Sequence, residues 1–129
     1  MLTVATRRVG LWLPPLIYMG IIFHFSSESN PLPEVTAHVW DKVLHTLEYA
    51  GLGFLLCRAL VGEGLGRRRA VVVAVVLASL YGASDEWHQL FVPLRTADVR
   101  DWLTDNAGAT LGAGLYAVSG VGRRDRREE

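Results

Sequence analysis

The stretch Tyr81-Gly82-Ala83-Ser84-Asp85-Glu86-Trp87-His88-Gln89 decides how the rest of the chain is interpreted. It directly follows residues 70–80, a run that holds no charged side chain and only one hydroxyl. On a helix, Tyr81, Asp85 and His88 lie at i, i+4 and i+7 and therefore share one face. A helix that is apolar along most of its length and polar at its end has a different meaning in water and in lipid.

Composition limits the possibilities for the whole chain. The 129 residues predict a single domain over 1–129. Half of the residues are hydrophobic, and the mean hydropathy is +0.24. Cys57 is the only cysteine, which excludes an internal disulfide. The formal net charge is zero, and we expect no nucleic-acid partner.

The hydropathy pattern predicts an all-α chain of four helices, at roughly 9–25, 38–61, 70–89 and 101–121. The first segment, which follows Arg7 and Arg8, also fits a cleaved signal peptide. It lacks a small-x-small cleavage pattern at its end, and a membrane span tolerates Pro14-Pro15 better than a signal core does. We therefore expect an uncleaved span. Asp98 or Thr96 is expected to cap the fourth helix.

A membrane bundle explains the helices better than a soluble bundle does. A soluble bundle needs a polar stripe along every helix, and the third helix has none from Ala70 to Tyr81. The fourth has no charge from Asn106 to Gly122. Each of these runs reaches the roughly 20 residues of a membrane span only if the polar residues at its end also lie at membrane depth. The fourth helix also contains small residues that are expected to let helices approach closely, namely Gly108, Gly112 and Gly114.

Basic residues predict the orientation. Ten arginines fall on one side of a four-span layout (Arg7, Arg8, Arg58, Arg67, Arg68, Arg69, Arg123, Arg124, Arg126, Arg127), and three basic residues fall on the other (Lys42, Arg95, Arg100). By the positive-inside rule, both termini are cytoplasmic. Trp40, Trp87 and Trp102 would then lie at the outer interface as an aromatic belt.

This layout brings polar side chains from four helix ends to the outer membrane level. The candidate catalytic residues are Asp85, His45, His88 and Glu86, and the candidate substrate-binding residues are Asp41, Lys42, Tyr49, Gln89, Arg95, Asp101 and Asp105. Nine acids lie on this side against three bases (Glu28, Glu34, Asp41, Glu48, Asp85, Glu86, Asp98, Asp101, Asp105). Such crowding in a low dielectric forces some carboxylates to bind a proton, pair with Lys42 or Arg95, or hold a cation.

The same residues resemble the VanZ family of small bacterial membrane proteins, named for a member linked to teicoplanin (glycopeptide) resistance. The resemblance covers about residues 12–114. It rests on Ile22-Phe23 through Ser26-Ser27, Asp41-Lys42-x-x-His45-x-x-x-Tyr49, Ser84-Asp85-Glu86-x-His88-Gln89, Pro93-x-Arg95, and Asp101 with Gly108. The family often has Asn four residues after the aspartate, where this chain has Asp105 followed by Asn106. The resemblance implies a multi-pass protein of the bacterial cytoplasmic membrane in an envelope or antibiotic-response context, without an established reaction.

Three classes of function fit these residues. The first is an intramembrane hydrolase or transferase that acts on a lipid-linked envelope substrate, with a carboxylate and a histidine as general acid and base. The second binds a lipid head group or a cationic amphiphile, and the third is a structural partner subunit. Asp85 paired with Lys42 or Arg95 would suit the third class. A divalent metal could also be held by four of these side chains, namely His45, Glu48, Asp85 and His88. The histidines lack an HExxH-type spacing, so a metal is left open, and no cofactor is assigned.

Overall fold

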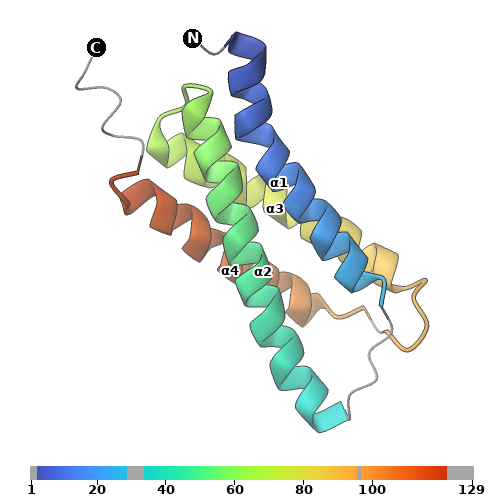
Figure 1. Cartoon of the computed structure of the whole chain (residues 1–129). Coiled ribbons are helices and arrows are strands. Elements are labelled where there is room, and N and C mark those ends of the chain that lie inside the picture. The colour runs from blue at the N-terminus through green and yellow to red at the C-terminus, as the bar shows by residue number, and fades with distance from the viewer. Residues whose placement is uncertain (1–2, 29–33, 96, 122–129) are drawn as a thin grey trace.

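Four helices make up the part of the chain that the structure, a computed structural model, describes, namely residues 3–28, 34–95 and 97–121, with the side chains of 34–40 left out. They are α1 (Val4–Ser26), α2 (Glu34–Gly62), α3 (Arg67–Gln89) and α4 (Val99–Val118), and the described residues contain no strand. Successive helices run in opposite directions, so the ends of α1 and α3 lie near the starts of α2 and α4 (Figure 1). The all-α prediction is confirmed.

The helix boundaries differ from the predicted ones by a few residues. α1 begins five residues earlier than expected, at Val4, where the Thr3 hydroxyl accepts a hydrogen bond from the backbone N–H of Thr6. α2 begins at Glu34 rather than near 38, and α3 takes in the three arginines at 67–69. α4 begins two residues earlier than predicted, at Val99, and ends three residues earlier because the backbone becomes extended at Ser119. Asp98 caps α4 as predicted, and the alternative cap at 96 lies outside the described residues.

A seam of small residues brings α2 and α4 into close contact. A Cβ atom at Gly112 would collide with the backbone of Ala50, and one at Gly108 with the backbone of Thr46. From the other side, Gly53 leaves no room for a Cβ against the backbone of α4. The packing role predicted for Gly108 and Gly112 is confirmed. The same prediction is wrong for Gly114, which faces open space.

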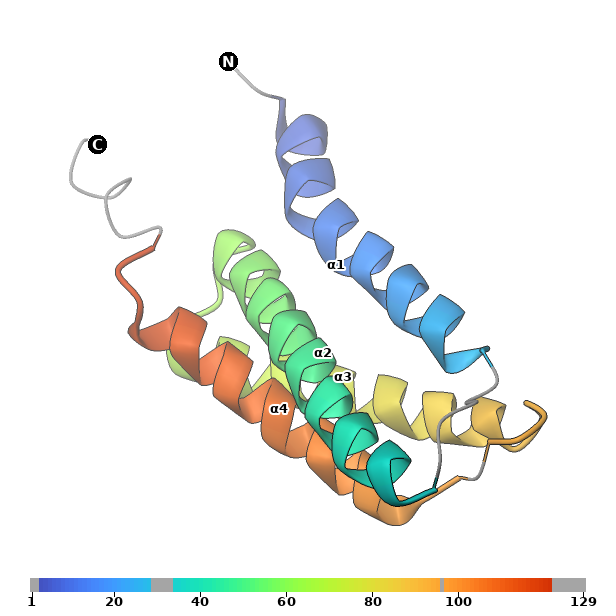
Figure 2. The same ribbon diagram turned by 60° about the horizontal axis from the view of Figure 1, so that its bottom comes forward.

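Figure 2 shows α2, α3 and α4 packed together, with α1 at the edge of the group. The buried core consists mostly of side chains from the three packed helices, among them Leu52, Cys57, Ala74 and Ala113. α1 contributes few buried side chains, such as Ile22. α1 is therefore the helix most exposed to the surroundings.

Among the described residues, three helical segments are long and apolar enough to cross a membrane: Val4–Ser26, Asp41–Gly62 and Arg67–Gln89. Their outer surfaces carry large apolar side chains, and Leu16, Val72 and Leu80 are each about three-fifths exposed (59%, 63% and 64%). A surface of this kind suits lipid rather than water. α4 is not among the three segments. The chain is therefore a membrane protein with several apolar helices suited to spanning.

Arg67 has a structural role that the sequence did not indicate. Its guanidinium donates hydrogen bonds to the carbonyls of Tyr116, Ala117 and Ser119 (3.1, 3.2 and 3.4 Å) and to that of Val121 (2.9 Å). The last carbonyls of a helix have no partner within the helix. Arg67 therefore closes the C-terminal end of α4 and ties it to the start of α3.

Candidate functional site

The candidate site lies where α1 and α3 end and where α2 and α4 begin. Asp41 and His45 are one turn apart on α2, and Asp101 and Asp105 are one turn apart on α4. The i, i+4 spacing directs each pair along one helix face. The close contact at Gly108 and Thr46 brings the two faces together.

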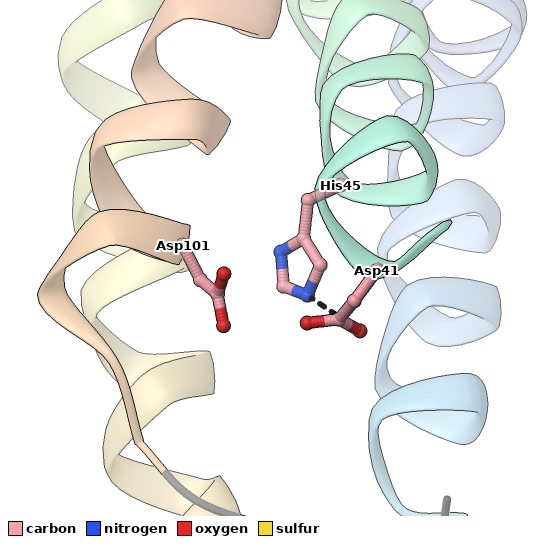
Figure 3. A group of neighbouring side chains, drawn as sticks. All are labelled: Asp41, His45 and Asp101. Atoms are coloured by element: carbon pink, nitrogen blue, oxygen red, sulfur yellow. Dashed lines mark ion pairs between the residues drawn. The ribbon is translucent and has the colours of Figure 1, made fainter. Parts of the chain in front are cut away.

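His45 is the centre of the site. Its Nδ1 lies 2.6 Å from Oδ1 of Asp105, and its Nε2 lies 3.8 Å from Oδ1 of Asp41. In Figure 3, the Asp41 carboxylate lies below the His45 ring and the Asp101 carboxylate lies to the left of it. His45 is 5% exposed and Asp105 0% exposed, so their contact is shielded from solvent. A hydrogen bond to a charged group is strong in such surroundings.

The two cations at this end contact the shallower carboxylates. Lys42 Nζ lies 3.5 Å from Oδ1 of Asp101, and a guanidinium nitrogen of Arg95 lies 3.4 Å from Oδ1 of Asp41. Arg95 also donates to the carbonyl of Glu28 beyond the end of α1 (2.8 Å). In the described part of the chain neither cation pairs with Asp85, so the structure does not bear out the alternative in which Asp85 forms a structural ion pair.

Several carboxylate oxygens deeper in the site have no hydrogen-bond partner among the described residues. They are both oxygens of Asp85, Oε1 of Glu86 and Oδ2 of Asp105. The three residues are 3%, 8% and 0% exposed, respectively. The other Glu86 oxygen accepts the backbone N–H of Asp98 at 3.0 Å, which ties α3 to the start of α4. Buried polar atoms are rarely left unpaired, so these oxygens mark a position where a ligand would be stabilised.

His88 lies away from this cluster. Its ring stacks on Phe23 of α1 with 4.4 Å between centroids, and its Nδ1 is buried without a partner among the described residues. It lines a cavity of about 410 Å³ together with six residues of α1, α3 and the following turn (Phe23, Tyr81, Ser84, Asp85, Trp87, Phe91). Asp85 is the acid of this set, so the two candidate catalytic residues Asp85 and His88 meet at the cavity rather than beside His45.

Two further predicted site residues, Gln89 and Tyr49, have distinct environments in the structure. Gln89 donates from Nε2 to the Ser26 hydroxyl at 3.2 Å, which joins the ends of α1 and α3. Tyr49 is 0% exposed, its ring lies parallel to that of His45, and its hydroxyl has no partner among the described residues.

The structure also distinguishes the two polar residues of the fourth helix. Asp105 faces His45, whereas the Asn106 amide donates to the carbonyl of Trp102 in its own helix at 2.8 Å. Asp105 is therefore the residue that faces the site.

Gly82 is a site residue that sequence reasoning missed. A Cβ atom there would lie 3.1 Å from Oδ2 of Asp105 and 3.4 Å from the ring of Tyr49. A larger residue would press on the unpaired oxygen. A lone glycine within a long helical pattern, which normally has a packing or functional reason, was the signal that could have found it.

In the part of the chain that the structure describes, two groups of side chains have the spacing to hold a metal ion. They are Asp41, His45 and Asp101 in one group, and His45, Glu86 and Asp105 in the other. In each group the ligand atoms lie within 4.8 Å of one another. The arrangement thus combines a hydrogen-bonded histidine, several carboxylates and two cations at one end of the helices.

Comparison with known proteins supports one assignment. No curated protein matches this chain. No solved structure matches it either. A model of the VanZ/LLP1 family matches residues 4–120, which is nearly the whole chain and includes all four helices and every candidate site residue. The chain therefore belongs to the VanZ/LLP1 family.

Proposed function

We propose that this protein binds an amphiphilic cell-envelope ligand from the outer side of the bacterial cytoplasmic membrane. The ligand inserts its hydrocarbon part into the cavity between α1 and α3 and places a cationic group against Asp85. In this proposal residues 1–129 form one membrane domain, all four helices span, and both termini are cytoplasmic. Membrane lipids and the amphiphile are the partners.

The cavity beside Asp85 carries the proposal. Its volume of about 410 Å³ falls within the range of ligand pockets. Its wall is mainly aromatic, with Phe23, Trp87 and Phe91 all at least half exposed at its rim (50%, 67% and 72%). Asp85 forms part of the wall, and neither of its oxygens is paired among the described residues. Hydrocarbon next to a buried carboxylate complements a hydrophobic cation, because both parts of the ligand leave water together.

The orientation of the site rests on the basic residues at the opposite end of the helices. Arg7, Arg58 and Arg67 lie at that end, where α1 and α3 begin and α2 ends. A cysteine at Leu94, which is 81% exposed, is expected to react with an impermeant thiol reagent in intact cells in a Cys57→Ala background. A cysteine at Gly64 is expected to react only after lysis. The reverse pattern would place the site on the cytoplasmic side.

The binding test compares two fluorescent amphiphiles with the same twelve-carbon chain, an alkylammonium and an alkylsulfonate. The protein is held in nanodiscs of zwitterionic lipid, so that the bilayer itself selects neither charge. The ammonium probe is expected to bind saturably and more tightly than the sulfonate. Asp85→Asn should weaken the ammonium probe roughly 10- to 100-fold, the equivalent of about 1.5–3 kcal/mol for a hydrogen bond to a charged group.

Glu28→Gln is the matched control, because Glu28 is an exposed acid at the same end of the molecule. It should leave the affinity unchanged. Equal binding of the two probes, or an unchanged affinity in Asp85→Asn, would overturn the proposal.

A second candidate function is favoured by the contact between His45 and Asp105. A histidine oriented by a carboxylate is a common arrangement for acid–base catalysis. It fits an intramembrane hydrolase or transferase that acts on a lipid-linked envelope substrate, in a glycopeptide-resistance-like context. Lipids of cells that carry the wild type, His45→Gln or no copy of the gene should then differ. A lipid that accumulates both without the gene and with His45→Gln would identify the substrate, and three identical profiles would exclude this candidate.

A further inference from the structure

We propose that His45, Glu86 and Asp105 bind a divalent transition-metal ion at the centre of the helix bundle. The three residues come from α2, α3 and α4, the three helices that pack most closely. This site is separate from the amphiphile cavity, to whose wall none of the three residues belongs. The two proposals can therefore fail independently.

The geometry of the three side chains suits one ion. Their ligand atoms lie within 4.8 Å of one another, and all three residues are buried. Metal–ligand distances of about 2.0–2.2 Å put two ligands of one ion at most ~4.4 Å apart. Shifts of a few tenths of an ångström, which side chains make easily, would close the site around an ion.

Unpaired oxygens point independently to a ligand. Oδ2 of Asp105 and Oε1 of Glu86 are buried and have no hydrogen-bond partner among the described residues. The residues are 0% and 8% exposed, so bulk water does not compensate them. Gly82 keeps the space next to Oδ2 free of a side chain. A cation bound by both oxygens removes the cost of burying them unpaired.

The contacts of Lys42 and Arg95 indicate which of the two groups that share His45 would hold the ion. Lys42 contacts Asp101 and Arg95 contacts Asp41, so both carboxylates of the shallower group already have a positive partner. Neither Lys42 nor Arg95 contacts Glu86 or Asp105, and the basic side chain that does lie against Asp105 is His45, itself a proposed ligand. The deeper group is therefore the one in which an added cation balances charge.

The second carboxylate oxygen of Glu86 also helps to orient this side chain. Oε2 accepts the backbone N–H of Asp98 at 3.0 Å, while Oε1 is left for the ion. Outer contacts of this kind orient metal ligands. Asp98 is itself the cap of α4, so the contact is held by the start of a helix.

The donor set indicates the class of metal. One imidazole nitrogen with carboxylate oxygens suits Zn²⁺ or Mn²⁺ better than Ca²⁺ or Mg²⁺, which prefer oxygen alone. Ligands that come from three helices also link binding to bundle stability, because the ion binds only the folded arrangement.

The test measures metal binding to the full-length protein, purified in detergent and stripped with EDTA. After dialysis against Zn²⁺ or Mn²⁺ alone, elemental analysis should find one ion per chain for at least one of the two metals. Glu86→Gln and Asp105→Asn should each weaken binding by more than the roughly 10- to 100-fold that loss of an outer-shell partner costs. Glu28→Gln, an exposed acid at the same end, should bind like the wild type.

Two further measurements keep the result unambiguous. Gel filtration and melting of the metal-free variants show whether they are folded, and only folded variants are compared. In a Mn²⁺-loaded sample, pulsed electron paramagnetic resonance should show coupling to a histidine nitrogen that is lost in His45→Gln. Less than a tenth of an ion per chain with both Zn²⁺ and Mn²⁺ would overturn the proposal. So would binding that is lost in Asp41→Asn and kept in Glu86→Gln, because the shallower group would then be the site.

Discussion

Replacing His45 should reveal how much this residue stabilises the buried carboxylate of Asp105. In His45→Leu the 2.6 Å contact disappears, and Asp105, which is 0% exposed, keeps a carboxylate with neither oxygen paired. Breaking a buried ionic contact by removing one partner costs about 3–5 kcal/mol. Adding Asp105→Asn replaces the stranded carboxylate by a neutral amide, for which burial without a partner costs only about 1–3 kcal/mol. The second substitution should therefore recover about 2 kcal/mol.

The assay is a double-mutant cycle on EDTA-treated protein, with the free energy of unfolding measured in detergent for the wild type, both single variants and the double variant. Asp85→Asn is the matched control, because Asp85 is also a buried acid but has no partner to strand among the described residues. It should unfold no more easily than the wild type. If Asp105→Asn destabilises the His45→Leu background as much as it destabilises the wild type, the two residues are not coupled and the reasoning is wrong.

Two predictions concern the scaffold. Gly112→Ala should destabilise the fold by about 1–3 kcal/mol because its Cβ would collide with the backbone of Ala50. Gly114→Ala should leave the stability unchanged because Gly114 faces open space. Equal melting temperatures for the two variants would contradict the close α2–α4 contact. Arg67→Gln should cost about 1–2 kcal/mol because the last carbonyls of α4 lose a charged donor, measured by thermal melting. Arg68→Gln, an exposed neighbour, should melt like the wild type, and a similar loss in both variants would mean that Arg67 acts only through its charge.

Much of the site could be predicted from the sequence because helical periodicity is local. The i, i+4 spacing was enough to place Asp41 with His45 and Asp101 with Asp105 on common faces. Alternation of helix direction then brought the two faces to the same end. The existence of four helices followed equally from the apolar runs.

The partner of each side chain could not be predicted in this way. His88 and Asp85 line the same cavity, as their shared helix face suggests, but the sequence did not indicate that His88 would stack on Phe23 of α1. A pairing of Lys42 or Arg95 with Asp85 was one alternative, and the two cations instead contact Asp101 and Asp41. Periodicity within one helix does not say which neighbouring helix covers each face, and these contacts depend on that arrangement.

The aromatic belt stays a prediction. Trp87 is 67% exposed, as a residue at a membrane surface would be. Trp102 is half-buried, and its indole N–H donates to the carbonyl of Ser79 in α3 at 3.0 Å. The side chain of Trp40 lies outside the described residues. Trp102 thus has a structural contact whatever its position in the membrane.

The glycine seam between α2 and α4 makes the packing of the two helices independent of the polar residues of the site. Gly108 follows Asp105 by three residues, and its backbone partner Thr46 is the neighbour of His45, so contact between main chains determines how far apart the two polar faces lie. The spacing does not depend on which acids or bases occupy those faces. Related chains could exchange the polar residues over evolutionary time and keep the same scaffold, and a designer could install a different buried polar set at this position without redesigning the helix packing.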